Sequence, residues 1–190
     1  PGMVMVKRTN GSDNWTVQHR SLGGTKSLYL NEPDTQDVSA SEWNNTPATS
    51  TVFTVGTSGK TNALNDTYVA YIFAHDDQSF GTDGDEAIIK CGSYTGTNIG
   101  QIQVDLGFEP QFVMIKRSSG SATVYTNWGI LDDIRGTHTQ TADDKLLAAN
   151  LNGQELGTYL YGTSNLVEFN PNGMFVDPPG AGSTTVNTSG

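Results

Sequence analysis

Pro110-Gln-Phe-Val-Met-Ile-Lys-Arg117 is nearly a copy of the first eight residues of the chain, Pro1-Gly-Met-Val-Met-Val-Lys-Arg8. Each stretch has the composition of a β-strand. This similarity indicates a tandem repeat in which the sequence begins and ends within a repeat unit. We therefore expect the fold to be built from two related units.

The residues before Pro110 supply the leading strands of the second unit. Ile88-Ile89 begins a strand, Tyr94-Thr-Gly-Thr-Asn98 forms a turn, and Ile102-Gln-Val-Asp-Leu106 alternates with period two. Later segments also match: Asn127-Trp-Gly-Ile130 matches Asn14-Trp-Thr-Val17, Lys145-Leu-Leu-Ala-Ala-Asn150 lies where Leu28-Tyr-Leu-Asn31 lies, and Phe175 matches Phe53. The repeat predicts the equivalences of Val4 with Val113, Val6 with Ile115, and Trp15 with Trp128.

Short strands separated by turns predict an all-β fold, an antiparallel β-sandwich of jelly-roll-like type. Residues 1–87 form the first repeat, which lacks its leading strands, and residues 88–190 form the second, which lacks its closing strand. That closing strand is the counterpart of Tyr68-Val-Ala-Tyr-Ile-Phe73 and is expected beyond Gly190. Because a unit cut in this way has open edges, residues 1–190 are not expected to form an autonomous domain.

Further strands are expected at Thr51–Val55 and Tyr68–Phe73, and a helix of one or two turns only within Thr141–Leu151. The core is expected to draw on these positions: Val4, Val6, Trp15, Val17, Phe53, Tyr68, Ala70, Ile72, Ile89, Val104, Leu106, Val113, Ile115, Trp128, Ile130 and Phe175.

Composition excludes several classes of function. The chain has 190 residues, a net charge of −10 and a pI near 4.5. An acidic surface repels phosphate, so we expect neither nucleic acid nor anionic lipid as a partner. No apolar run approaches the length of a membrane span. The single cysteine, Cys91, permits no intrachain disulfide and no cysteine metal site.

No catalytic, cofactor or metal constellation emerges. Gly59-Lys60-Thr61 resembles the end of a phosphate-binding loop, but Thr54 stands where that loop needs glycine. Asp83-Gly-Asp85-Glu86 is a fragment of a calcium loop without the remaining ligands, so a solvated acidic linker is favoured. Three histidines, His19, His75 and His138, share no motif, and His19 is expected at the surface.

Aromatic residues are the remaining candidates for a binding role, as platforms on which sugar rings stack. Trp15 and Trp128 alternate with apolar neighbours and are expected in the core. Trp43 lies in the polar segment Ser41-Glu-Trp-Asn-Asn45 and is expected to be exposed. Trp43 and Tyr94 are therefore the candidate ligand-binding residues.

Three motifs follow one another along the chain: Ile89-Lys-Cys-Gly-Ser-Tyr-Thr-Gly96, Gly107-Phe-Glu-Pro-Gln-Phe-Val-Met-Ile-Lys-Arg117 and Asn127-Trp-Gly-Ile-Leu-Asp-Asp-Ile-Arg-Gly136. Together they resemble a recurrent unit of large tailed-bacteriophage virion proteins. Tyr68–Phe73 is similar to the strand that closes such units. The first repeat departs from the pattern, since His19-Arg-Ser-Leu-Gly23 replaces the Asp-x-x-Arg-Gly block. The resemblance implies no catalytic residues.

The first hypothesis is a non-catalytic structural or interaction segment of a phage tail, fibre or other virion surface protein. It would act in assembly or host attachment, with other virion subunits as partners and as a homo-oligomer. The alternative is a carbohydrate-binding module that recognises host surface glycans, or another host receptor, through Trp43 or Tyr94. A depolymerase would need two convergent carboxylates, which the sequence does not identify.

Overall fold

The computed structural model describes residues 1–97, 99–120, 126–135, 145–152 and 166–177. The chain divides into two compact units, Pro1–Ser93 and Tyr94–Gly190, whereas the sequence placed the boundary after residue 87. All strand pairs in the described residues are antiparallel. The prediction of an all-β antiparallel fold is confirmed.

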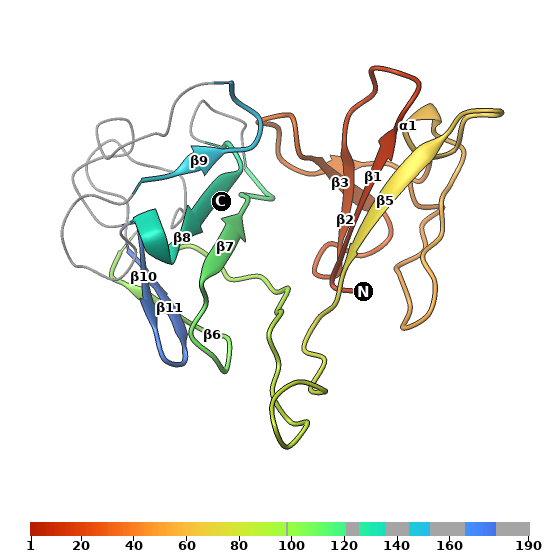
Figure 1. Ribbon diagram of the computed structural model, residues 1–190. Coiled ribbons are helices and arrows are strands. Elements are labelled where there is room, and N and C mark those ends of the chain that lie inside the picture. The colour runs from red at the N-terminus through yellow and green to blue at the C-terminus, as the bar shows by residue number, and fades with distance from the viewer. Residues whose placement is uncertain (98, 121–125, 136–144, 153–165, 178–190) are drawn as a thin grey trace. The chain divides into compact units, whose positions relative to one another are not determined.

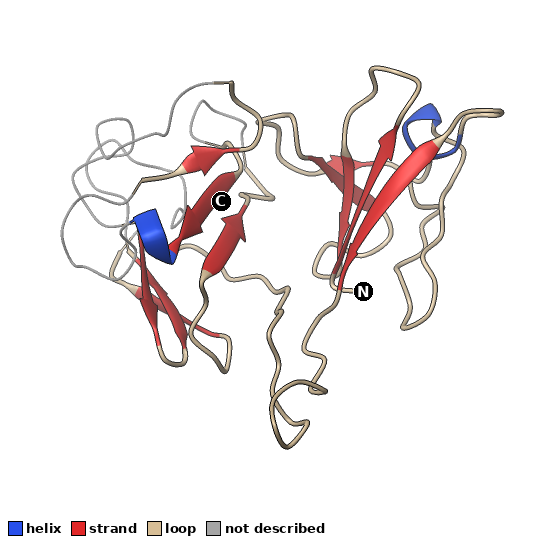
Figure 2. Cartoon of the chain, in the orientation of Figure 1, coloured by secondary structure: helices blue, strands red, loops and turns tan. Residues whose placement is uncertain are grey.

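The first unit is a five-stranded sheet in the order β4-β3-β2-β1-β5 (Figure 1). Its strands are β1 (Met3–Arg8), β2 (Thr16–His19), β3 (Lys26–Tyr29), β4 (Asp37–Val38) and β5 (Tyr68–Phe73). One short helix, α1 (Gly59–Asn62), lies in the long connection between β4 and β5. Most of that connection is drawn as loop in Figure 2. β5 therefore joins the sheet beside β1 from far along the chain.

The core of the first unit lies between β1 and the connection from β4 to β5. Val4 and Val6 alternate on one face of β1 and pack with the fully buried Trp43. The Trp43 indole Nε1 donates to the Ser27 hydroxyl at 2.8 Å, so its polar atom is satisfied. Phe53 and Val55 pack against the same cluster. Apolar side chains anchored in this way hold a polar segment against the sheet.

The described residues of the second unit form two three-stranded sheets. One has the order β7-β8-β9, with β7 (Phe112–Ile115), β8 (Gly129–Asp132) and β9 (Leu147–Ala148). The other has the order β10-β11-β6, with β10 (Val167–Asn170), β11 (Gly173–Val176) and β6 (Ile102–Asp105). A 3-10 turn, η1 (Asp133–Arg135), follows β8.

Both sheets of the second unit contribute to one core. Its buried members are Val113, Leu131, Leu146, Leu166, Val167, Phe169, Met174 and Val176. Because two antiparallel sheets share this apolar cluster, the second unit has the organisation of a small β-sandwich.

The first two strands of the β7 sheet pair in the same register as β1 and β2. In the first unit Val4 is opposite Gln18 and Val6 is opposite Thr16. In the second unit Val113 is opposite Leu131 and Ile115 is opposite Gly129. The backbone bonds that continue the two ladders also agree, since Arg20 N donates to Gly2 O and Asp133 N donates to Gln111 O.

An asparagine closes the same local structure in each unit. The Asn31 side chain accepts from the Trp15 N–H at 2.8 Å and donates to Asn14 Oδ1 at 2.8 Å. Asn150 accepts from the Trp128 N–H at 3.0 Å and donates to Asn127 Oδ1 at 2.7 Å. Each asparagine lies two residues after a strand, β3 or β9, and bonds to the two residues that precede β2 or β8.

Two predicted strands are absent from the described residues. Thr51–Val55 crosses over the sheet instead of joining it, and its continuation bonds to a loop, with Gly56 N donating to Glu42 O at 2.8 Å. Ile88-Ile89 is an exposed loop segment near the end of the first unit. Phe53 and Val55 are partly buried against the core of the first unit, which explains their apolar character without a strand.

The predicted helix within Thr141–Leu151 is wrong where it can be compared. Residues 141–144 lie outside the described residues, and Leu147–Ala148 forms β9, paired with β8. Leu146 is completely buried, so core packing overrides helix propensity at this point. Among predicted core residues, Ala70, Ile72 and Ile89 are exposed.

Candidate interaction site

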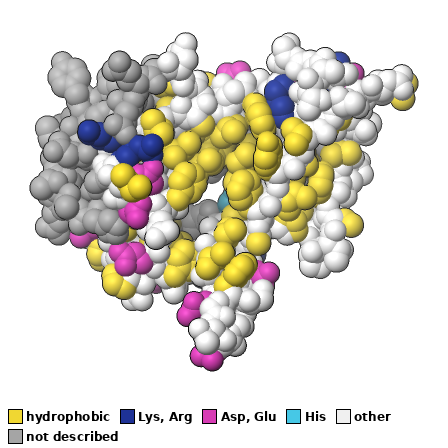
Figure 3. All heavy atoms as spheres, viewed as in Figure 1, with side chains coloured by type: hydrophobic (Ala, Val, Ile, Leu, Met, Phe, Trp, Pro, Cys, Tyr) yellow, Lys and Arg dark blue, Asp and Glu magenta, His cyan; other side chains and the backbone are white. Residues whose placement is uncertain are grey.

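β5 is an edge strand whose side chains are exposed on both faces of the sheet. Its sequence, Tyr-Val-Ala-Tyr-Ile-Phe, contains no charge, proline or glycine. Val69, Tyr71 and Ile72 are 37%, 50% and 56% exposed. Figure 3 shows hydrophobic side chains over this strand on the visible face of the first unit. Natural proteins usually shield such an edge with charges, proline or a bulge.

The register of β5 identifies which of its backbone groups are open. Thr9 N donates to Thr67 O, and these two residues continue the register in which Lys7 pairs with Val69. Because antiparallel hydrogen bonds alternate, every second residue of β5 turns its N–H and C=O away from β1. Those residues are Tyr68, Ala70 and Ile72. No described residue bonds to their outward backbone groups.

The beginning of β5 is held firmly in place. The Tyr68 hydroxyl accepts from Ala63 N and donates to Gly59 O, both at 2.7 Å. Just before it, Asp66 forms an ion pair with Arg8 at 2.8 Å and accepts from the Asn10 amide at 2.9 Å. The edge is therefore ordered before any partner arrives, which lowers the entropic cost of binding.

The second unit has a comparable edge at β7. Asp133 N donates to Gln111 O, so Val113 and Ile115 direct their backbone groups to β8, while Phe112 and Met114 direct theirs outward. No described residue pairs with that outer side. Phe112 is 56% exposed, and Val113 packs into the core.

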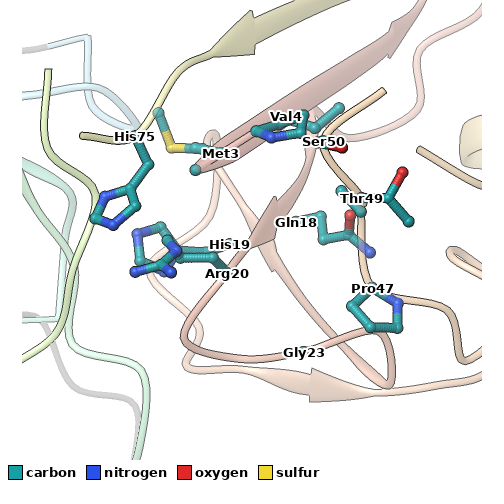
Figure 4. A pocket seen from close by; sticks show the side chains of 13 residues that line it. Met3, Val4, Gln18, His19, Arg20, Gly23, Pro47, Thr49, Ser50 and His75 are labelled. Atoms are coloured by element: carbon teal, nitrogen blue, oxygen red, sulfur yellow. The ribbon is translucent and has the colours of Figure 1, made fainter. Parts of the chain in front are cut away.

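A cavity of about 400 Å³ lies beside the first residues of β1 and the last residues of β2. His19, Arg20 and His75 gather on one side of it, and Gln18 and Thr49 lie on the other (Figure 4). Gln18 is almost completely buried and donates through Nε2 to Thr46 O at 3.1 Å. Its Oε1 is buried and has no hydrogen-bond partner, which leaves an unsatisfied acceptor beneath the cavity wall.

The pKa values of the two histidines at this cavity are lowered. Burial, followed by the charge of Arg20, lowers the pKa of both His19 and His75. The His75 Nδ1 accepts from the Cys91 N–H at 3.1 Å, which also favours the neutral ring. Burial raises the pKa of the Cys91 thiol, and its Sγ faces the Ala74 carbonyl. These groups do not form an activated nucleophile and base.

The two sequence-predicted ligand residues lie in different units. The expected exposure of Trp43 is wrong, because its ring is completely buried and offers no face to a sugar. Tyr94 is half-buried and packs against the core of the second unit, and burial raises the pKa of its hydroxyl. Trp128 is buried, while Trp15 is half-buried with its ring centroid 6.0 Å from that of Tyr71.

The segment that resembles a phosphate-binding loop has a structural role. Ser58 caps α1 through its hydroxyl, and the helix ends at Asn62. Lys60 donates to the Tyr29 hydroxyl at 2.7 Å, lies over that ring at 4.5 Å and pairs with Glu42 at 3.5 Å. The Lys60 ammonium group is therefore occupied by contacts within the first unit. A helix of four residues is also too short to form a phosphate-binding site at its N-terminus.

Sequence reasoning missed the cavity and its acceptor. Gln18 lies between Val17 and His19 on β2, and nothing in that pattern reveals an unpaired amide oxygen. The edge position of β5 was also missed, although its lack of charge was visible. A run of six apolar residues indicates burial as readily as an exposed edge.

A family model described as a domain of unknown function (DUF7483) matches residues 1–190. No curated protein and no solved structure matches the chain. Within the described residues, no helix is long and apolar enough to cross a membrane. The same residues contain no cluster of three or more His, Cys, Asp or Glu side chains suited to a metal ion.

Proposed function

The chain belongs to the DUF7483 family, and we propose that it is a non-catalytic structural and interaction segment of a bacteriophage virion surface protein, in the tail or a fibre. It acts in assembly or host attachment through open strand edges. Its partners are other virion subunits, including further copies of the same chain.

The observation that carries this proposal is the unprotected edge of β5. An ordered strand with outward N–H and C=O groups and apolar side chains on both faces is a template for another strand. Exposed apolar surface of this kind marks sites of protein association. The assignment to a virion rests on the motif resemblance around Gly107–Arg117 and Asn127–Gly136.

We further infer that the two units are copies of one repeat. The shared register of β1–β2 and β7–β8 supports this inference, as do the matching contacts of Asn31 and Asn150. Repetition suits an assembly role, because several weak contacts on one polypeptide combine into strong attachment.

Self-association of the chain tests the proposal. Ile72→Lys places a charge on the exposed edge, where lysine opposes strand pairing. We expect the unaltered chain to associate as its concentration rises and Ile72→Lys to remain monomeric, measured by sedimentation velocity. Val52→Lys is a matched control, since Val52 is also 56% exposed but lies outside any strand. A chain that stays monomeric at every concentration contradicts the homo-oligomer, and equal loss in both variants contradicts the role of β5.

The cavity favours a second candidate function, carbohydrate binding. The buried Gln18 Oε1 lacks a partner, and a rotation of this side chain toward the cavity would let it accept from a sugar hydroxyl. Thr49 adds a hydroxyl on the same side of the cavity, and Arg20 adds a donor on the opposite side. This location differs from the one predicted at Trp43.

A glycan array separates the two functions. Carbohydrate recognition at the cavity predicts a signal that Gln18→Met abolishes and Val52→Lys retains, with both variants folded by circular dichroism. A blank array for the unaltered chain removes the carbohydrate alternative and leaves the assembly role.

A further inference from the structure

The outer edge of β7 reproduces the edge of β1 that holds β5. From Val4 to Arg8 the first unit reads Val-Met-Val-Lys-Arg, and from Val113 to Arg117 the second reads Val-Met-Ile-Lys-Arg. The register with the next strand is the same in both units. In β1 the backbone groups of Met3 and Met5 face β5, and in β7 the equivalent groups of Phe112 and Met114 face outward.

We propose that the β7 edge is a docking site for an extended, uncharged polypeptide segment outside residues 1–190 that has the pattern of Tyr68–Phe73, the pattern expected of the closing strand of the second unit. The segment adds antiparallel to β7 as β5 adds to β1. This inference deepens the proposed function by naming the class of partner, and it concerns a different edge from the one tested by Ile72→Lys.

The pairing observed at β1 specifies the side chains of the docked segment. On β1, Val4 is opposite Ile72 and Val6 is opposite the small Ala70. The same arrangement places an aliphatic residue opposite Val113 and a small one opposite the larger Ile115. Cross-strand pairs of aliphatic residues stabilise a sheet, and a small residue leaves room for the added methylene.

The residues on the other face of β7 also match those of β1. On β1, Met5 is opposite Tyr71 and Met3 is opposite Phe73. Met114 occupies the position of Met5, and Phe112 replaces Met3 with an exposed ring. The docked segment therefore presents aromatic residues to Met114 and Phe112, where sulfur–aromatic and aromatic contacts are favourable.

The occupant is a separate strand and not β5 of a second copy. The groups of β5 that fit a β1-type edge belong to Val69, Tyr71 and Phe73, and these already face β1 in the same chain. A second copy therefore offers only the opposite side of its β5. The ligand of the β7 edge must be an otherwise unpaired segment, recognised through backbone bonds and alternating side chains.

A peptide with the sequence of Tyr68–Phe73, flanked by lysines for solubility and fluorescently labelled, is the probe. We expect saturable binding to the full chain by fluorescence anisotropy. Met114→Pro removes an N–H that points outward and not toward β8, so proline is tolerated there as on other edge strands. The substitution removes the hydrogen bond from the Met114 N–H to the peptide, and the proline ring also clashes with the docked strand. Affinity for the peptide should therefore fall at least about ten-fold.

Ala70→Pro is the matched control. It removes the equivalent outward N–H from β5 and leaves β7 unchanged, so peptide affinity should stay within about two-fold of the unaltered chain. A peptide with the same residues in an order that breaks the alternation should not bind. Circular dichroism establishes that each variant is folded. Should Met114→Pro not fold, Phe112→Asp tests the same edge at an exposed side chain.

Each outcome decides the proposal. Binding that Met114→Pro or Phe112→Asp weakens and Ala70→Pro retains supports it. No binding of the peptide, equal binding of the scrambled peptide, or loss only in Ala70→Pro overturns it. Dimerisation of the full chain through β7, abolished by Met114→Pro, also overturns it, because the occupant is then a second copy. None of these results depends on self-association through β5.

Discussion

At the scale of single residues, the molecule depends on side chains that fix where its strands begin. Asn31 and Asn150 make the same two hydrogen bonds in their respective units. Asn31 is exposed, whereas Asn150 is half-buried. Hydrogen bonds shielded from water cost more to lose, because the remaining groups are less easily solvated.

Asn150→Ala should therefore destabilise the chain more than Asn31→Ala does. Loss of two hydrogen bonds is expected to lower the free energy of unfolding by about 1–3 kcal/mol for Asn150→Ala. Urea unfolding followed by circular dichroism measures the difference. Asn152 is exposed nearby and serves as the control, for which Asn152→Ala should change stability by less than about 0.5 kcal/mol. An equal loss of unfolding free energy in Asn31→Ala and Asn150→Ala would contradict the claim that shielding from water strengthens the Asn150 hydrogen bonds.

His19 and His75 predict a dependence of stability on pH. Burial and Arg20 lower the folded-state pKa of both rings below the ordinary value of 6.5. Below pH 6.5 the unfolded chain binds protons that the folded chain does not, so stability falls as pH drops through this range and is level above it. The melting temperature measured between pH 5 and 8 should show this fall. Replacing both histidines with glutamine should flatten it, and an unchanged slope would contradict it.

At the scale of elements, the connection from β4 to β5 is mostly loop, yet part of it packs closely against itself. A Cβ at Gly56 would meet the Ser41 carbonyl, and Ser58 N donates to that same oxygen at 2.9 Å. Thr61 Oγ1 donates to Glu42 O at 3.1 Å. The connection thus functions as a packed layer over the sheet.

Gly56→Ala should destabilise the first unit by about 1–3 kcal/mol, because the added methyl group overlaps the backbone of the opposite loop. Gly92→Ala is the control, since a Cβ there meets nothing within 4 Å. Thermal unfolding of the two variants gives the comparison. If Gly56→Ala is as stable as Gly92→Ala, the close packing of this connection is not a determinant of stability.

Strands with a clear local β-composition could be predicted from the sequence. Segments whose conformation depends on packing against distant residues could not. The strands at Met3–Arg8, Tyr68–Phe73 and Phe112–Ile115 show clear β-composition and form as expected. Thr51–Val55 has the same composition, yet it packs across the sheet. Leu146–Ala148 has helix formers, yet pairing with β8 makes part of it a strand.

The site was less predictable than the fold. Whether a tryptophan in a polar segment is buried depends on which residues pack against it in the folded chain. Trp43 donates to Ser27 and packs against β1. Likewise, an apolar strand becomes an open edge only because no other described strand follows β5 in the sheet. These are properties of the assembled chain and leave no local trace in the sequence.

At the scale of the whole molecule, the proposed function requires β5 to accept a partner strand. The outward N–H groups of Ala70 and Ile72 would then become hydrogen-bonded, while those of Val69 and Tyr71 already face β1. Pairing at this edge therefore protects the amides of alternate residues of β5 from exchange, whereas general hydrophobic aggregation does not produce this alternation.

Residue-resolved hydrogen exchange across a concentration series tests the central claim most directly. As the chain associates, exchange at Ala70 and Ile72 should slow at least about ten-fold, with Val69 and Tyr71 protected throughout. The amide of the exposed Asn152 should exchange at the same rate at every concentration. Association with unchanged exchange at Ala70 and Ile72, or the absence of association at any concentration, would contradict the claim that β5 is the edge through which this chain assembles.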